Sequence, residues 1–149
     1  MMKFAVLSRA EIKDFKTDKK HIVISVMDPN DSEGRAKMLD NKKREGVLWM
    51  AFHDWNGRQM KMIKDKPVPN ERDWVFFDSK MAKLIVDFVQ CHQMEADLVV
   101  CQCEAGISRS AGIAAALAKC INGNDFYFFN RYLPNSLVYS LIMKEWNKQ

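Results

Sequence analysis

Residues 110–120 constrain the fold more than any other part of the chain, because their small side chains are apolar on every side of a helix. A helix without a polar face lies in the centre of a domain. This stretch follows soon after residues 98–101, Leu-Val-Val-Cys, and so short an apolar run is typical of a buried strand. A buried strand that leads through a short loop into a buried helix predicts a layered α/β domain.

The rest of the chain alternates between strand-like and helix-like segments. Apolar runs predict strands at 4–7, 21–27 and 47–52, and helix-start signals predict helices at 8–15, at 79–92 and from Asn135 or Ser136 onward. The charged segment 36–45 is predicted as one exposed helix. We therefore predict an α/β fold with a central, mostly parallel sheet of four to five strands and helices on both faces.

Length and composition suit a single globular domain over 1–149, since the 149 residues are 48% hydrophobic. The apolar runs fall well short of the roughly 18 residues of a membrane span, so we expect no membrane partner. The first seven residues contain one Lys and no small-residue cleavage site, so no secretory signal is predicted. Without such a signal, the four cysteines are expected to be reduced thiols in the cytoplasm.

The charge and the cysteine spacing limit the possible partners. A net charge of +4 fits an anionic substrate but is too small for a nucleic-acid-binding surface. The cysteines and histidines match no zinc-ligand spacing, so we expect no metal and no other cofactor. We also expect a monomer.

The segment from 99 to 110 carries the chemistry. In parallel α/β sheets, ligands bind at the carboxyl ends of strands, and a helix N-terminus offers free backbone N–H groups to an anion. Cys103 follows the strand and Arg109 begins the helix, and the loop between them can curl its N–H groups around a phosphate. We call residues 103–109 the phosphate loop. Its predicted phosphate-binding residues are Glu104, Ala105, Gly106, Ile107, Ser108 and Arg109.

Three side chains of this segment have predicted catalytic roles. The helix N-terminus and the guanidinium of Arg109 favour a thiolate at Cys103, which would lie in line to attack a bound phosphorus atom. Arg109 adds a planar fork of donors that matches two phosphate oxygens. Ser110 is predicted to hydrogen-bond the thiolate and later to help it leave.

The pattern Cys-x5-Arg-Ser, from Cys103 to Ser110, resembles the cysteine-dependent protein tyrosine and dual-specificity phosphatase superfamily, most of all its small bacterial and phage-type members. The resemblance covers residues 3–146 and includes the segment 131–135, Arg-Tyr-Leu-Pro-Asn, before the last helix. It implies a phosphatase-like fold and a phosphoprotein or phosphopeptide substrate. The reaction it implies is hydrolysis of phosphotyrosine, and also of phosphoserine or phosphothreonine, through a phosphocysteine. An inactive phosphate-binding protein and a phosphatase for a non-protein ester are the alternatives.

The chain departs from the family pattern at Gln102, because the family has His directly before the nucleophile. That His orients the loop and the cysteine through hydrogen bonds. Gln also donates and accepts hydrogen bonds, so the loop can survive the exchange.

The resemblance implies that an Asp on a movable loop protonates the leaving group. Asp54 is the preferred candidate, because it follows a strand that ends at the same sheet edge as Cys103. Asp73 is the alternative. It lies in the stretch 55–74, which is predicted as a long loop of the kind that forms lids. Asp78 is better explained as a helix cap.

Two further features have structural interpretations. The aromatic segment 126–129 is predicted to fill the core around the last helix, with binding of an aromatic substrate as the alternative. Asn135 is predicted to cap the last helix, and the resemblance implies that its side chain instead braces the phosphate loop.

Overall fold

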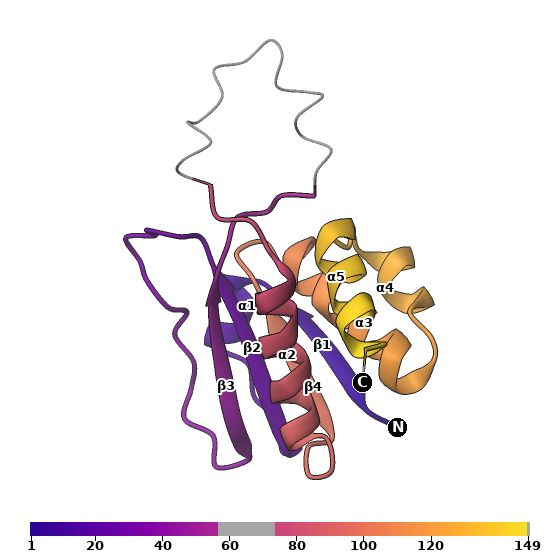
Figure 1. Cartoon of the computed structure of the whole chain (residues 1–149). Coiled ribbons are helices and arrows are strands. Elements are labelled where there is room, and N and C mark those ends of the chain that lie inside the picture. The colour runs from indigo at the N-terminus through magenta and orange to yellow at the C-terminus, as the bar shows by residue number, and fades with distance from the viewer. Residues whose placement is uncertain (57–73, 149) are drawn as a thin grey trace.

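The computed structural model describes residues 1–56 and 74–148. These residues form a four-stranded sheet in the order β1-β4-β2-β3, and all of its strand pairs are parallel. The strands are β1 (Lys3–Leu7), β2 (His21–Met27), β3 (Arg44–Ala51) and β4 (Leu98–Gln102). Their carboxyl ends lie at one edge, which is the upper edge in Figure 1. The predicted α/β fold with a parallel sheet is confirmed.

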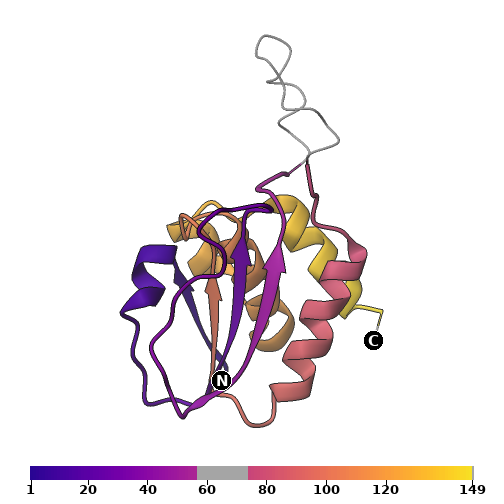
Figure 2. The ribbon, with the colours of Figure 1, turned by 90° about the vertical axis from the view of Figure 1, so that its left-hand side faces the viewer.

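Helices cover both faces of the sheet, as predicted. The helices are α1 (Arg9–Lys13), α2 (Ser79–His92), α3 (Arg109–Asn122), α4 (Phe126–Arg131) and α5 (Ser136–Trp146). In Figure 2, α1 lies on one side of the sheet, while α2 and α5 lie on the other. Successive residues of β2 point to opposite faces of the sheet. Ile22 and Ile24 belong to the core that includes α2, α3 and α5, whereas Val23 packs with Ile12 of α1 on the other face.

The helix ends follow the signals in the sequence. Ser8 and Glu11 form the predicted capping box of α1. Asp78 caps α2 by accepting a hydrogen bond from Met81 N–H at 2.9 Å. Gly123 ends α3 with a positive φ of 79°, a conformation that glycine adopts without strain. The centre of α3 is buried on all sides, in agreement with its lack of a polar face.

The predicted exposed helix at 36–45 is wrong. Residues 36–40 form neither helix nor strand, and β3 begins at Arg44. Ala36 is buried and Met38 packs beside it on the α1 side of the sheet. Because α1 is short and buries only Ile12, this face needs further apolar cover, which Ala36 and Met38 supply.

The prediction for the aromatic segment 126–129 is wrong for three of its four residues. Only Phe128 of α4 is buried, and its ring packs edge-on against Phe4 of β1. Phe126, Tyr127 and Phe129 are exposed. The segment forms a short surface helix, so a single inward position anchors it.

Most of the predicted long loop lies outside the described residues, and so does the candidate acid Asp73. At the base of this stretch, His53 and Val75 exchange two hydrogen bonds, of 2.8 and 2.9 Å. The rings of Trp55 and Phe76 pack beside this pair, with Trp74 between them and His53. Within 1–56 and 74–148, no helix is long and apolar enough to cross a membrane.

Candidate active site

The phosphate loop begins at the carboxyl end of β4 and packs against the end of β1. Cys103 N–H donates to the carbonyl of Leu7 at 3.3 Å, and Arg9 N–H donates to the carbonyl of Glu104 at 3.1 Å. Gly106 has a φ of 67°, and a Cβ at this position would lie 2.5 Å from the backbone nitrogen of Ser8. The turn therefore requires glycine both for its conformation and for the close approach of two backbones.

Cys103 and Ser110 are brought together as the sequence predicts. The Sγ of Cys103 lies 3.0 Å from the Oγ of Ser110, and both side chains are buried. Since Ser110 lies in the first turn of α3, its hydroxyl reaches the sulfur from the helix side. A hydroxyl in this position can donate a hydrogen bond to a thiolate.

Cys101 lies two residues before Cys103 but has a different environment. It is fully buried in the core. Burial raises the pKa of the Cys101 thiol, and the neighbouring Cys103 raises it further. Cys101 therefore behaves as a small apolar residue of the sheet.

Gln102 supports the loop from the opposite face of β4. Its Nε2 donates to the carbonyl of Cys103 at 2.9 Å, and its Oε1 accepts a hydrogen bond from Ser25 of β2. The side chain is fully buried, so these bonds do not compete with water. Gln102, which stands where the family has His, thus holds the backbone of Cys103.

The guanidinium of Arg109 points toward the ends of β2 and β3, and only 6% of the residue is exposed. Its Nη1 donates to Asp28 Oδ1 at 2.6 Å and to the carbonyl of Phe52 at 2.8 Å. A buried guanidinium needs a counter-charge, which Asp28 supplies. Because Nη1 donates to two acceptors, the orientation of the guanidinium plane is also fixed.

Asp28 was not among the predicted site residues. The sequence analysis did not consider its side chain, which lies beside Arg109 although 81 positions separate the two residues. One signal was available, since Asp28 directly follows β2 and therefore lies at the same sheet edge as Cys103.

Asp54 lies against the phosphate loop. Its Oδ1 accepts hydrogen bonds from Ser108 Oγ and from Asn135 Nδ2, each at 2.8 Å. The structure thus brings this candidate acid to the loop, whereas the carboxylate of Asp78 is engaged in capping α2.

Asn135 joins three parts of the site. Its Nδ2 also donates to the carbonyl of Trp55 at 3.0 Å, and its Oδ1 accepts from Val138 N–H at 3.1 Å, which caps α5. Its own N–H donates to the carbonyl of Ser108 at 3.0 Å. The residue therefore both caps a helix and holds the segment that carries Asp54 against the phosphate loop.

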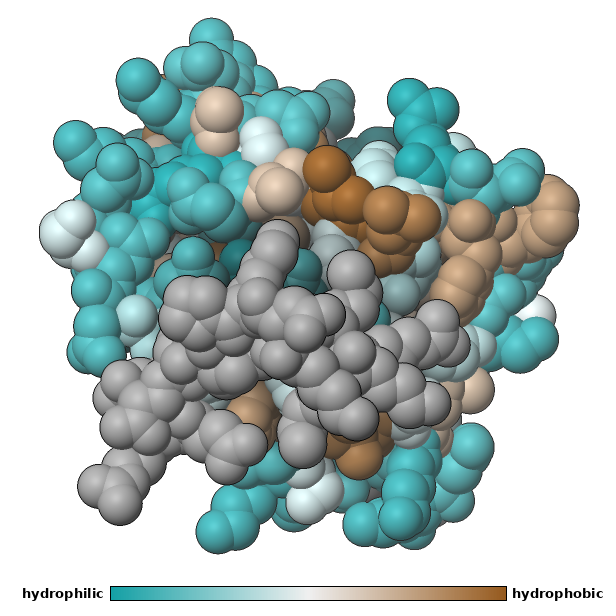
Figure 3. All heavy atoms as spheres, turned by 90° about the horizontal axis from the view of Figure 1, so that it is seen from above, coloured by the Kyte–Doolittle hydropathy of each residue, from teal (hydrophilic) through white to brown (hydrophobic). Residues whose placement is uncertain are grey.

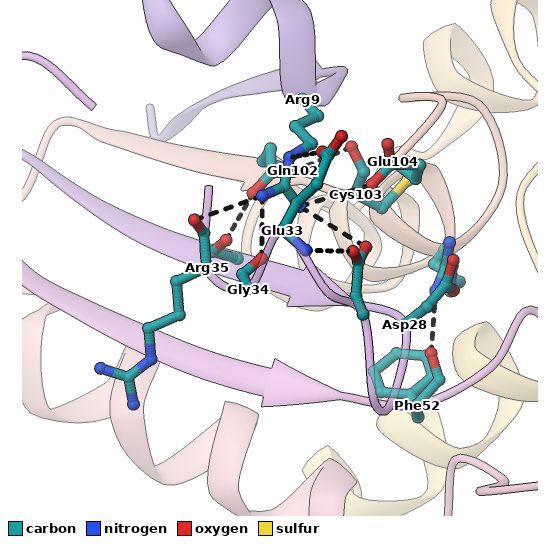
Figure 4. Close-up of polar contacts among 12 residues, drawn as sticks. Arg9, Asp28, Glu33, Gly34, Arg35, Phe52, Gln102, Cys103 and Glu104 are labelled. Carbon is teal, nitrogen blue, oxygen red and sulfur yellow. Dashed lines mark hydrogen bonds and ion pairs between the residues drawn. The ribbon is translucent and has the colours of Figure 1, made fainter. Parts of the chain in front are cut away.

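Arg9, which the sequence analysis did not single out, forms a cluster behind the loop (Figure 4). Its guanidinium lies 3.6 Å from Glu104 Oε2 and 3.2 Å from Glu33 Oε2, and it donates to the carbonyl of Gly34 at 2.9 Å. These contacts tie the start of α1 to the phosphate loop and to the segment that follows β2. That segment also carries Asp28.

A cleft of about 620 Å³ opens beside the phosphate loop. Asp54, Ala105 and Ser108 belong to both the cleft and the site, and Phe129 and Leu133 also line the cleft. Among residues 1–56 and 74–148, no group of three or more His, Cys, Asp or Glu side chains could hold a metal ion.

No protein-family model matches the sequence, and no curated protein matches it. Solved structures do match in fold. PTPMT1 in complex with PI(5)P aligns with a TM-score of 0.52 at 16% identity, over 86% of this chain and 77% of that one. Tk-PTP in its active form aligns with a TM-score of 0.53 at 13% identity, over 98% and 91%.

The chain therefore has the fold of the cysteine-dependent protein tyrosine and dual-specificity phosphatases, and the resemblance stated from its sequence is confirmed at the level of the fold. Within that fold, Cys103, Ser110 and Arg109 lie at the junction of β4 and α3.

Proposed function

We propose that this protein hydrolyses phosphate monoesters on phosphoproteins, chiefly phosphotyrosine and also phosphoserine or phosphothreonine, through a phosphocysteine intermediate. The observation that carries the proposal is the placement of Cys103. Its sulfur lies 3.0 Å from the Ser110 hydroxyl at the N-terminus of α3, and the buried Arg109 guanidinium belongs to the same loop.

The first chemical step transfers the phosphoryl group to sulfur. The loop N–H groups and Arg109 hold the phosphate oxygens and neutralise their charge in the transition state. The bond from Cys103 Sγ to phosphorus forms while the ester P–O bond breaks. Asp54 then gives a proton to the leaving oxygen.

The second step releases phosphate. A water molecule gives its proton to the Asp54 carboxylate and attacks phosphorus, and the S–P bond breaks. Ser110 donates a hydrogen bond to the departing thiolate. The contacts of the Asp54 carboxylate with Ser108 and Asn135, which hold it against the phosphate loop, support its assignment to both proton transfers.

The composition of the loop supports a singly phosphorylated protein side chain as substrate. Substrates with several phosphates need additional cations at the loop, but its interior contains Glu104 and no Lys. The carboxylate of Glu104 lies with Arg9.

Turnover of p-nitrophenyl phosphate tests the proposal. We expect hydrolysis that persists with a chelator and is inhibited by orthovanadate, followed by hydrolysis of phosphotyrosine and phosphothreonine peptides. Cys103→Ser should lower turnover by several orders of magnitude, since a hydroxyl ionises far less readily than a thiol. Cys91→Ser, at an exposed position of α2, is the matched control. If the parent protein binds phosphopeptides but does not hydrolyse them, it is an inactive phosphate-binding protein and the proposed function is wrong.

A further inference from the structure

The cleft beside the phosphate loop has an unusual exposed rim. Ile107, Phe129 and Leu133 are large apolar residues that line it, and their exposed fractions are 45%, 48% and 75%. Leu133 N–H donates to the carbonyl of Ile107 at 3.1 Å, so the rim is fixed to the phosphate loop itself. Figure 3 views the molecule from above, and hydrophobic surface is visible on this face.

The charges around the cleft are few. Asp54 is the one charged side chain among the described residues that line it. No Lys or Arg in the described lining would stabilise an acidic group in the cleft. The cleft therefore suits an uncharged, apolar group.

We propose that this cleft binds an apolar side chain that neighbours the phosphorylated residue of a peptide substrate, an inference that rests on the proposed function. Under the proposed function, the ester oxygen of a phosphate held by the loop faces Asp54, which also lines the cleft. The substrate chain beyond that oxygen passes along the rim. An apolar side chain there covers Leu133 and Phe129 and is itself removed from water.

The same observations favour a peptide over a phosphorylated lipid. A lipid headgroup with several phosphates needs cations in the cleft, and the described lining of the cleft contains none. A peptide with one phosphate and an apolar neighbour needs only the loop and the rim.

Two series of phosphotyrosine peptides test the proposal, one with Leu, Ala or Glu directly before the phosphotyrosine and one with the same residues directly after it. We expect kcat/KM to be roughly tenfold higher for Leu than for Glu in at least one series, because partial burial of a Leu side chain contributes on the order of 1.4 kcal/mol. Leu133→Glu should abolish this preference, so that the Leu and Glu peptides have equal kcat/KM relative to turnover of p-nitrophenyl phosphate by the same variant. Phe126→Glu, at a residue that is 68% exposed and outside the cleft lining, should change neither the preference nor that turnover.

Other outcomes would overturn the assignment of the cleft. Equal kcat/KM for Leu and Glu peptides in both series would contradict the assignment. A preference for Leu that persists in Leu133→Glu would also contradict it. The cleft would be assigned to lipid if the protein released phosphate from vesicles that contain a phosphatidylinositol monophosphate, if Leu133→Glu reduced that release, and if no peptide preference were found. If the parent protein does not hydrolyse p-nitrophenyl phosphate, the proposed function fails, and calorimetric affinities for the Leu and Glu peptides still decide whether the cleft selects apolar neighbours.

Discussion

At the residue scale, Asp28 fixes the guanidinium of Arg109, which under the proposed function holds the phosphate. Asp28→Asn should raise KM for p-nitrophenyl phosphate and weaken vanadate inhibition about tenfold, because a charge-assisted hydrogen bond contributes about 1.5 kcal/mol. Steady-state kinetics measure both. Asp31→Asn is the matched control, since Asp31 lies on the same segment and pairs with Arg9 at 3.8 Å. Equal effects of the two substitutions would show that Asp28 does not act through Arg109.

Asp54 is the residue whose chemical role most needs a direct test. Asp54→Ala should lower kcat for a phosphotyrosine peptide by roughly 10²–10⁴-fold, the usual contribution of a positioned acid. The loss should be much smaller for aryl phosphates whose leaving group is a stable anion, because these need no proton. Asp78→Ala, which removes only a helix cap, should show no dependence on the leaving group. The same dependence in Asp73→Ala, but not in Asp54→Ala, would assign the acid to Asp73.

The sequence predicted the local part of the site and the approach of Asp54 to the loop, but it missed the contact between Asp28 and Arg109. Cys103 and Ser110 are seven positions apart, so a strand, a loop and one helical turn bring them together. Asp28 reaches Arg109 only because β2 lies beside β4 in the sheet. No local pattern gives that strand order, so this contact could not be predicted from spacing.

At the element scale, the turn at Gly106 decides whether the phosphate loop forms. Gly106→Ala combines a positive φ with a Cβ only 2.5 Å from the backbone nitrogen of Ser8, and it should lower the free energy of unfolding by about 2 kcal/mol or more. Gly34→Ala is the control, because its φ is 69° but nothing lies within 4 Å of the added Cβ. We expect about 1 kcal/mol there, from the backbone conformation alone.

Urea unfolding and turnover of p-nitrophenyl phosphate together measure the effect of these two substitutions. Gly106→Ala should also lower turnover, because the loop N–H groups shift. A loss of stability no greater than that of Gly34→Ala would mean that the close approach to Ser8 is easily relieved.

The two errors at the element scale share a cause. Segment 36–45 is rich in charged residues that favour helix, yet residues 36–40 form neither helix nor strand, and Ala36 and Met38 cover the α1 side of the sheet. The segment 126–129 is strongly apolar, yet α4 lies at the surface and buries only Phe128. Both outcomes depend on which surface remains open after the larger elements have packed. Helices α2 and α5 were predicted well because each buries a face that its own sequence defines, and α3 because it is apolar on every side.

At the scale of the whole molecule, the strand order assembles the site. β4 lies between β1 and β2, so the phosphate loop emerges at the centre of the carboxyl edge. β1 supplies the backbone at Leu7 that holds Cys103 N–H, and Asp28 after β2 holds Arg109. The carbonyl of Phe52, directly after β3, holds the same guanidinium. The ends of β1, β2 and β3 therefore help to position Cys103 or Arg109, which follow β4.

Alkaline pH should destabilise the whole fold. Burial raises the pKa of the Cys101 thiol, raises that of Cys120 to about 11, and, with a hydrogen bond to Asp125, raises that of Tyr139 to about 12. Each group is neutral when protonated, so its contribution to stability is complete below its unfolded pKa, about 9 for thiols and 10 for tyrosine. As the pH rises toward the folded pKa, that contribution is lost.

Urea unfolding under reducing conditions at pH 7, 9 and 10.5 measures this loss. We expect the free energy of unfolding to be nearly constant up to about pH 8 and to fall above about pH 9, where the unfolded thiols release protons and the buried ones do not. Cys101→Ala should be less stable at pH 7, because it leaves a small cavity, but its stability should fall less steeply above pH 9. Cys91→Ala, at an exposed thiol, should keep the slope of the parent protein. Parallel pH profiles for Cys101→Ala and the parent protein would show that the buried thiol does not contribute to alkaline unfolding.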